Sequence, residues 1–328
     1  MRILYLLTAL LCSQSIMAQQ VVLQKQRHFT ERVPAGNYSG ITWLGGNRYA
    51  VADDKSPSAG FHLMTIDIDS INGQLLRVTA DSFMTSGEKN RDEEGICYVP
   101  QSNTLFISSE ANGKIIEYDM HGLPTRRQLN IPEIFRNTYS NAGFEALTYN
   151  AKTHLFWTTT ENSLKPDGLQ PSIKNRVSNR LRLQSFGDDL EPRHQYWYIT
   201  DTTATTRTEG RSFLGVSGLA ALDDGRIVVL ERELFFPSGK IGSFAHVKLY
   251  VVRPSLHQPG DTLEKQLLTQ FRTRINLTAR SFANYEGICV GPRLADGSMV
   301  LVLVCDSQNQ YRGMLYDWFR TVVIKNDE

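Results

Sequence analysis

The fold is decided by the stretch Arg91-Asp92-Glu93-Glu94-Gly95-Ile96-Cys97-Tyr98-Val99, which runs on to Asn103-Thr104-Leu105-Phe106-Ile107-Ser108-Ser109-Glu110. An acid and a glycine open a short apolar segment, a polar turn follows, and a second apolar segment ends on an acid. Two runs rich in Val, Ile, Leu and aromatic residues with a turn between them predict a β-hairpin.

The same phrase recurs along the chain. Its other copies are Ser39-Gly40-Ile41 leading to Asp53, Glu145-Ala146-Leu147 leading to Glu161, Ser217-Gly218-Leu219 leading to Glu231, and Glu286-Gly287-Ile288 leading to Asp306. A strand-forming phrase that returns every 50 to 70 residues predicts an all-β propeller. We expect five blades of four antiparallel strands. A sixth blade without the phrase would fit in the longer spacings after the third and fourth repeats. Val21 to Val33 resembles one strand, and it would close the ring by joining the last blade.

The hairpin places acids at one end of each blade, because the start of its first strand lies beside the end of its second strand. The first strands of a propeller surround its central channel. We therefore expect eight carboxylates to meet at one mouth: Glu94, Glu110, Glu145, Glu161, Glu286, Asp306, Asp53 and Glu231. Serine replaces the opening acid in two repeats, at Ser39 and Ser217.

Composition excludes some classes of partner. The 328-residue chain has a net charge of +1, which argues against a nucleic-acid partner bound through bulk electrostatics. Cys97, Cys289 and Cys305 remain after the leader; their odd number and wide spacing predict buried thiols rather than a disulfide framework or a zinc site.

The N-terminus is typical of an export signal. Residues 1–18 combine a short basic start, an apolar run and Ala18 as the cleavage position. The run is too short to predict a membrane span. Cys12 is a poor lipoprotein anchor, because the bulky Leu11 precedes it. We expect residues 19–328 to form one monomeric domain, secreted or periplasmic, with no membrane span.

Converging carboxylates need compensation. Two like charges about 4 Å apart repel by roughly 4 kcal/mol at an effective dielectric near 20. Raised pKa values, basic partners or a bound cation would each relieve this repulsion. Ca²⁺ suits the third case, because it takes 6 to 8 oxygen ligands in flexible geometry. The alternative is a purely structural set of acids, paired with arginines or with neighbouring backbone amides.

These phrases also resemble a known family. Residues 39–309 are similar, in order, to the phytase-like family described as having esterase-like activity; the matching phrases include Asp92-Glu93-Glu94-Gly95-Ile96 with Ser109-Glu110, and Gly143-Phe144-Glu145-Ala146-Leu147 with Thr160-Glu161-Asn162. The resemblance implies a propeller, an exported protein and calcium-dependent hydrolysis of esters or phosphoesters.

The first functional hypothesis is a metal-dependent hydrolase of phosphate or other small-molecule esters. Arg91, Lys55 and Arg232 adjoin the acidic phrases and would hold anionic oxygens of the substrate. No Gly-x-Ser-x-Gly elbow occurs, which disfavours a serine hydrolase. Two alternatives remain: a non-catalytic binding propeller with structural calcium, and a calcium-dependent lactonase or carboxylesterase. The few basic residues in the phrases favour the latter over a phytate hydrolase.

Overall fold

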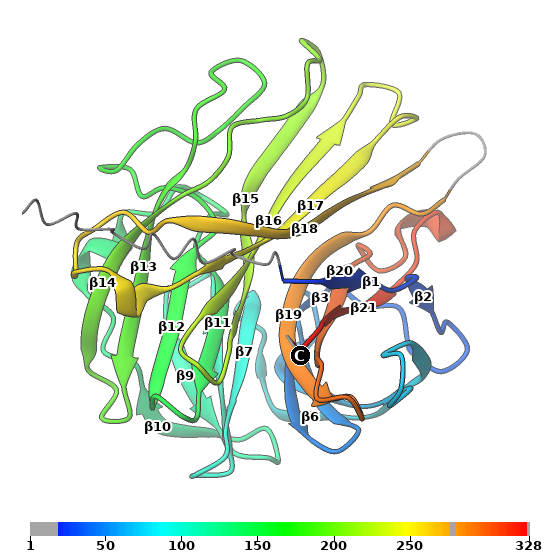
Figure 1. Cartoon of the computed structure of the whole chain (residues 1–328), viewed down its shortest axis with the longest axis vertical. Helices are drawn as coiled ribbons and strands as arrows, with labels where there is room; N and C mark the ends of the chain where they lie inside the picture. The colour runs from blue at the N-terminus through cyan, green and yellow to red at the C-terminus, as the bar shows by residue number, and fades with distance from the viewer. Residues whose placement is uncertain (1–18, 276–279, 327–328) are drawn as a thin grey trace, which may run out of the picture.

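The chain forms a ring of antiparallel sheets in a computed structural model that describes residues 19–275 and 280–326. The first four sheets contain four strands each. Their strands are β3 (Tyr38–Gly45), β4 (Arg48–Asp53), β5 (Ser58–Ile68) and β6 (Leu75–Lys89); β7 (Glu93–Val99), β8 (Thr104–Ser109), β9 (Ile115–Tyr118) and β10 (Pro124–Gln128); β11 (Phe144–Asn150), β12 (Leu155–Thr160), β13 (Arg180–Gly187) and β14 (Pro192–Ile199); β15 (Arg211–Ala221), β16 (Ile227–Phe236), β17 (Phe244–Val252) and β18 (Lys265–Arg274). Figure 1 shows these sheets as successive blades.

The fifth blade joins the two ends of the chain. It contains β19 (Asn284–Arg293), β20 (Met299–Asp306), β21 (Trp318–Ile324) and β1 (Val21–Leu23), with the short β2 (Arg27–His28) also paired to β21. β1 lies antiparallel to β21, with Val21 opposite Ile324. Five blades and closure by the N-terminal strand are thus confirmed, and the described residues leave no strands for a sixth blade. The predicted strand 21–33 is two short strands instead.

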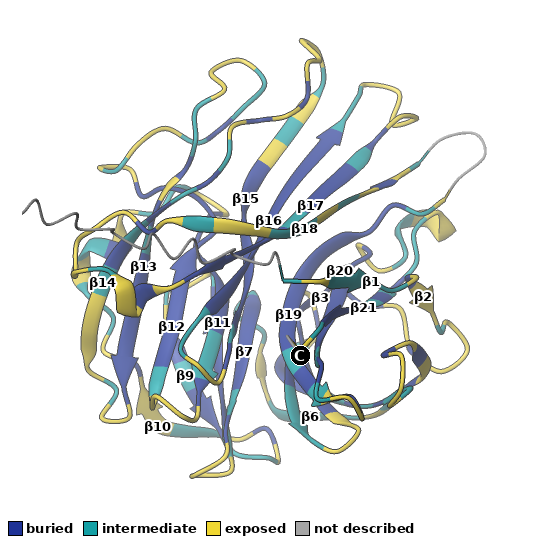
Figure 2. Ribbon diagram, viewed as in Figure 1, coloured by how far each residue is buried: buried dark blue, intermediate teal, exposed yellow. Residues whose placement is uncertain are grey.

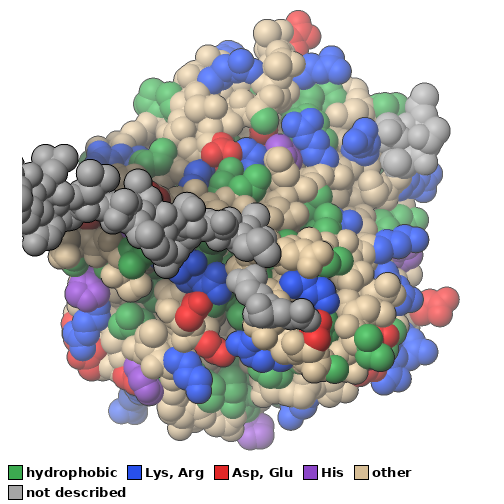
Figure 3. All heavy atoms as spheres, viewed as in Figure 1, with side chains coloured by type: hydrophobic (Ala, Val, Ile, Leu, Met, Phe, Trp, Pro, Cys, Tyr) green, Lys and Arg blue, Asp and Glu red, His purple; other side chains and the backbone are tan. Residues whose placement is uncertain are grey.

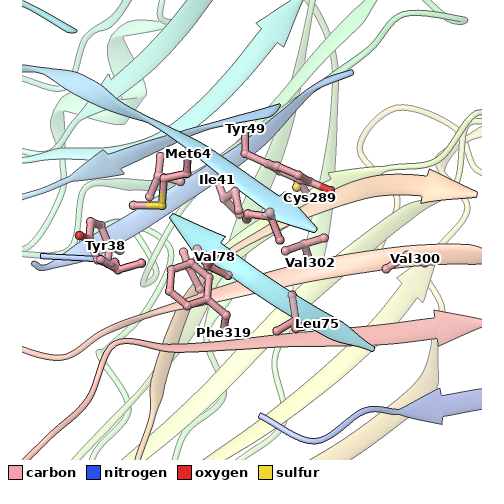
Figure 4. Packing of buried hydrophobic residues seen from close by; sticks show 14 of the residues in the cluster. Tyr38, Ile41, Tyr49, Met64, Leu75, Val78, Cys289, Val300, Val302 and Phe319 are labelled. Carbon is pink, nitrogen blue, oxygen red and sulfur yellow. The ribbon is translucent and has the colours of Figure 1, made fainter. Parts of the chain in front are cut away.

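Apolar side chains fill the spaces between neighbouring blades. One cluster joins the first and fifth blades, where Tyr38, Ile41 and Val78 pack with Val302 and Phe319 (Figure 4). The inner strands are the most buried part of the ring, and exposed residues gather at the loops and outer strands (Figure 2). Burial on both faces explains why the inner strands contain continuous apolar runs.

Glycines allow the inner strands to approach one another. A Cβ at Gly40 would lie 2.3 Å from the carbonyl oxygen of Glu94 in the next blade, and one at Gly95 would lie 2.7 Å from the nitrogen of Leu147 in the blade after that. Gly287 closes the ring, with the backbone of Gly40 3.0 Å from its would-be Cβ. The glycine of the repeated phrase therefore has a packing role.

Within the described part of the chain, helical structure is limited to three short 3-10 turns, at Glu133–Arg136, Pro254–Leu256 and Tyr311–Gly313. The first of these turns begins directly after Pro132. Among residues 19–275 and 280–326, no helix has the length and apolar character needed to cross a membrane. The predicted signal at residues 1–18 lies outside the described residues.

Candidate functional site: an acidic ring

The opening residue of every repeat lies in a β-bulge. Strand register slips by one residue between Tyr38 and Gly40, between Glu93 and Ile96, between Phe144 and Ala146, between Val216 and Gly218, and between Tyr285 and Gly287. A bulge inserts one residue into one strand and redirects its side chain. The bulges carry the three glutamates Glu94, Glu145 and Glu286 and the serines Ser39 and Ser217.

The two serines connect blades instead of offering ligands. Ser39 Oγ donates a hydrogen bond to the carbonyl oxygen of Glu93, 2.8 Å away in the second blade. Ser217 Oγ donates to the carbonyl oxygen of Tyr285, 3.1 Å away in the fifth blade. Three inner strands therefore supply carboxylates, and the other two supply interblade hydrogen bonds.

Each second strand adds one more charged residue at the same level. In each blade this residue pairs with the one that lies two positions before the opening residue of the first strand. From the first blade to the fifth, the charged residues are Asp54, Glu110, Glu161, Arg232 and Asp306. Strand pairing shows that these residues lie at the same height in their blades. Arg232 is opposite Gly215 and Asp306 is opposite Asn284. The amide of Asp54 donates to the carbonyl oxygen of Asn37 at 3.1 Å. Together with the inner glutamates, these carboxylates form what we call the acidic ring: Asp54, Glu94, Glu110, Glu145, Glu161, Glu286 and Asp306.

The ring is tightest at Glu94, Glu110 and Glu145. One carboxylate oxygen of each lies within 4.8 Å of the others. Glu94 and Glu145 are 5% and 8% exposed, and within the described residues neither side chain accepts a hydrogen bond. Burial raises the pKa of Glu94 well above its usual value, and the charge of Glu145 adds to that rise. Burial and the charge of Glu161 raise the pKa of Glu145 in the same way.

Arg232 supplies positive charge inside the ring. Its side chain is 7% exposed, and its Nη2 lies 3.0 Å from Glu286 Oε1 and 3.3 Å from Glu161 Oε1. Burial opposes the charged form, but the surrounding carboxylates, Glu286 foremost, hold the pKa of Arg232 above its usual value. The pKa of Glu286 is nevertheless raised, because burial outweighs the effect of Arg232. One guanidinium does not neutralise the ring.

Lys55 lies at the edge of the ring, where solvent reaches it. Its Nζ is 2.9 Å from Asp54 Oδ2 and 2.6 Å from Asp92 Oδ1, and its side chain is 57% exposed. Burial raises the pKa of Asp54 to about 6, although Lys55 partly offsets the effect. Lys55 is thus placed where an anionic group approaching the ring would meet it.

Two predicted ring members face elsewhere. Glu231 accepts hydrogen bonds from Tyr198 and Lys265, and Asp53 lies beside His62, with its Oδ1 accepting from the amide of Lys55. Glu231 stands one position before Arg232 within β16, and Asp53, the last residue of β4, stands one position before Asp54. Because successive side chains of a strand point to opposite faces, one position decides which of the two enters the ring.

Arg91 also differs from its expected place. Its Nη2 donates to Glu93 Oε1 at 3.0 Å and contacts the hydroxyl of Tyr118, and the other carboxylate oxygen of Glu93 accepts from the amide of Gly60. This buried network joins the first two blades. The structure therefore places Lys55 and Arg232 at the ring, and Arg91 in an interblade contact.

The sequence reasoning missed three residues at the ring. Asp54 was visible as the second acid of the Asp53-Asp54 doublet. Asn37 and Asn284 each precede an opening residue by two positions, and no sequence signal marked them. Buried oxygens of all three residues, Asp54 Oδ1, Asn37 Oδ1 and Asn284 Oδ1, have no hydrogen-bond partner among the described residues. The ring thus offers unpartnered oxygen atoms, the ligand type preferred by hard cations.

Comparisons with solved structures find chains of low similarity. They include the endo-arabinase from Bacteroides thetaiotaomicron (11% identity, 90% of this chain and 95% of that chain covered, TM-score 0.44) and virginiamycin B lyase from Staphylococcus aureus (10%, 93% and 100%, 0.38). The periplasmic gluconolactonase from Pseudomonas aeruginosa is another (12%, 70% and 71%, 0.29). No curated protein matches the chain. The sequence profile of one family, described as phytase-like with esterase-like activity of phytase, matches residues 33–308. The chain therefore belongs to the phytase-like family.

Proposed function

We propose that the protein hydrolyses small-molecule esters or phosphoesters at the acidic ring, with Ca²⁺ bound there. The observation that carries the proposal is the cluster of Glu94, Glu110 and Glu145, whose oxygens lie within 4.8 Å of one another at the ends of adjacent blades. Ligands that are all oxygens suit Ca²⁺ and disfavour zinc or copper, which prefer nitrogen and sulfur.

The residues present fit a calcium ion in number and kind. Glu94, Glu110 and Glu145 would hold it, and the unpartnered oxygens of Asp54 and Asn284 lie in the same ring. When bound, calcium would neutralise substrate charge and polarise the ester bond. Arg232 keeps Glu161 and Glu286 in place, and the exposed ammonium of Lys55 would bind an anionic oxygen of the substrate.

The charge around the ring favours a substrate with few negative charges. Lys55 is exposed but already shared between Asp54 and Asp92, and Arg232 is buried between two glutamates. Phytate carries many phosphates and would require more free cations than these. A monoester, a carboxyl ester or a lactone fits better than phytate. We expect an exported, monomeric enzyme.

The test combines calcium binding with turnover. The purified chain is titrated with calcium in a calorimeter, and hydrolysis of p-nitrophenyl phosphate, p-nitrophenyl acetate, a γ-lactone and phytate is followed with calcium or with excess chelator. The variant Glu94→Gln/Glu145→Gln should lose both calcium binding and turnover. The control Glu133→Gln changes a glutamate whose side chain is 86% exposed and should alter neither.

Turnover that survives chelation, or that persists in folded Glu94→Gln/Glu145→Gln protein, would contradict the proposal. Calcium binding without turnover of any of the four substrates would favour a second candidate, a binding propeller with structural calcium. The burial of Glu94 and Glu145 favours that candidate, because an ion held among buried side chains can serve the fold alone.

A further inference from the structure

A second charged site lies outside the acidic ring, between the outer strands of the fourth and fifth blades. It is a pocket of about 480 Å³ bordered by the N-terminal segment, β18, β21 and the chain just before β19. We call it the basic pocket. Among the residues that the structure describes, its lining includes four cationic side chains, those of Lys25, Arg27, Arg272 and Arg320, and no Asp or Glu. In Figure 3 the right-hand part of the surface, over β18 and β2, shows more blue than red side chains.

None of these four cations lies within 4.0 Å of a carboxylate among the described residues. A second charged pocket, which we call the paired hollow, differs in the pairing of its cations. There the cationic residues are paired: Arg226 with Asp224 at 2.6 Å, Arg293 with Asp223 at 3.3 Å, and Lys325 with Asp296 at 2.9 Å. The two pockets therefore differ: the cations of the basic pocket have no carboxylate partner among the described residues, whereas those of the other pocket do.

The three arginines of the pocket rest on aromatic rings. The guanidinium carbons of Arg27, Arg272 and Arg320 lie 5.1, 5.1 and 4.4 Å from the ring centroids of Phe29, Phe244 and Phe271, respectively. Cation–π contacts orient a guanidinium without neutralising it. Arg27 Nη1 already donates to the carbonyl oxygen of Leu75, and Arg272 Nη2 lies 3.5 Å from His246 Nδ1. The remaining N–H groups of the three guanidinium groups are the forked donors that recognise oxyanions.

Two donors of β21 strengthen the case for a ligand. Arg320 Nε and Trp318 Nε1 are buried and have no hydrogen-bond partner among residues 19–275 and 280–326. Burial lowers the pKa of Arg320, and Tyr285 only partly offsets this effect. Beside them, His28 stacks on Tyr316 at 4.3 Å and meets Trp318 edge-on at 4.8 Å, which gives the pocket an aromatic wall.

We propose that the basic pocket binds a small phosphate or sulfate ester, with the oxyanion among the arginines and the organic part against His28 and Trp318. The volume is that of a small-molecule site and exceeds what one inorganic anion fills. A bound anion would supply the countercharge that Arg27, Arg272 and Arg320 lack. Because the N-terminal segment lines the pocket, a bound ligand would also stabilise the packing of this segment against the fifth blade, where the two ends of the propeller meet.

The test measures binding of inorganic sulfate, inorganic phosphate and phenyl phosphate to the mature chain by calorimetry at low ionic strength. Excess chelator keeps the acidic ring free of calcium, so that ring repels these probes and the result does not depend on the proposed hydrolysis. The variant Lys25→Gln/Arg272→Gln removes two exposed cations of the pocket. The control Arg293→Gln/Lys325→Gln removes the same charge from the paired hollow.

We expect saturable binding of all three probes, tightest for phenyl phosphate. Affinity should fall at least tenfold in the pocket variant, since one lost charge-assisted hydrogen bond accounts for about that factor. It should change less than twofold in the control. Absence of saturable binding, or equal loss in the two variants, would overturn the proposal. Equal affinity for phosphate and phenyl phosphate would overturn the role of the aromatic wall.

Discussion

Replacing Arg232 by methionine tests whether the acidic ring is held by internal charge compensation. The substitution keeps an apolar stem but removes the cation between Glu161 and Glu286, which lie 3.3 and 3.0 Å from it. Breaking a buried ion pair by removing one partner costs about 3 to 5 kcal/mol, because the remaining charge is left uncompensated. We expect a loss of that size in the free energy of unfolding at pH 7.

The loss can be followed by thermal unfolding in excess chelator. For a chain of 328 residues, the entropy of unfolding is about 0.7 kcal/mol/K, so the expected loss lowers the Tm by about 4 to 7 °C. Adding Glu286→Gln to the variant should restore part of the Tm, because it removes one of the stranded charges. Arg293→Met is the control; Arg293 is 52% exposed beside Asp223, and such pairs contribute about 1 kcal/mol or less.

Acid should also rescue the variant. Without Arg232, protonation of Glu161 and Glu286 is the remaining way to relieve their charge, so the difference in Tm from the unmodified protein should shrink from pH 8 to pH 5. Equal Tm values for Arg232→Met and Arg293→Met, or a second substitution at Glu286 that only lowers the Tm further, would refute this reasoning.

Three further predictions concern the ring. In the calcium-free protein, raised carboxyl pKa values mean that the folded state holds protons more strongly than the unfolded state does. Protonation of these carboxyls therefore stabilises the folded state below about pH 4.5, and this stabilisation is lost as pH rises through the raised pKa values, about 6 for Asp54 and above the usual range for Glu94 and Glu145. The gain in Tm on adding calcium should consequently grow from pH 5 to pH 8. Calcium binding near pH 6 should release protons, so the calorimetric heat of binding should depend on the ionisation enthalpy of the buffer. Glu94→Gln/Glu145→Gln should abolish this proton release, and Glu133→Gln should preserve it. Gly40→Ala would place a Cβ 2.3 Å from a backbone oxygen and should cost at least about 2 kcal/mol by denaturant unfolding, whereas Gly239→Ala, with no atom within 4 Å, should cost little.

The architecture was predictable because its signal is repeated. Five copies of one phrase specify five hairpins, and the turn residues of each copy agree with its apolar runs. The turn at Asp223-Asp224-Gly225 shows how local that information is: Gly225 has a φ of +85°, which glycine adopts without strain, and its amide donates to the carbonyl oxygen of Leu222 at 2.9 Å. Ring closure by Val21–Leu23 was predictable as well, since the fifth repeat lacked a fourth strand.

The identity of the residues in the acidic ring was harder to predict, because side chains alternate between the two faces of a strand and a shift of one position exchanges the faces. At the second strands of the first and fourth blades, the conspicuous acids Asp53 and Glu231 precede the ring position by one residue. The bulges at the opening residues are set by contacts between blades, such as the one at Gly40, and alternation within a single strand does not reveal them. Asn37 and Asn284 escaped notice because an amide carries no charge and stands outside the repeated phrase.

The charge of the acidic ring explains why the proposed hydrolysis would depend on a bound cation. Seven carboxylates face two cations, Arg232 and Lys55, a difference of five charges if every group is ionised. Protons relieve that repulsion at low pH, which is the meaning of the raised pKa values of Glu94, Glu145 and Glu286. At neutral pH the divalent cation of the proposed function would relieve this repulsion while the carboxylates stay ionised. The first and fourth blades carry serine at the opening position, and the fourth blade also carries Arg232, so the negative charge is concentrated at Glu94, Glu110 and Glu145. In the proposed function, this sector of the acidic ring is where a cation would bind and where an ester would meet it.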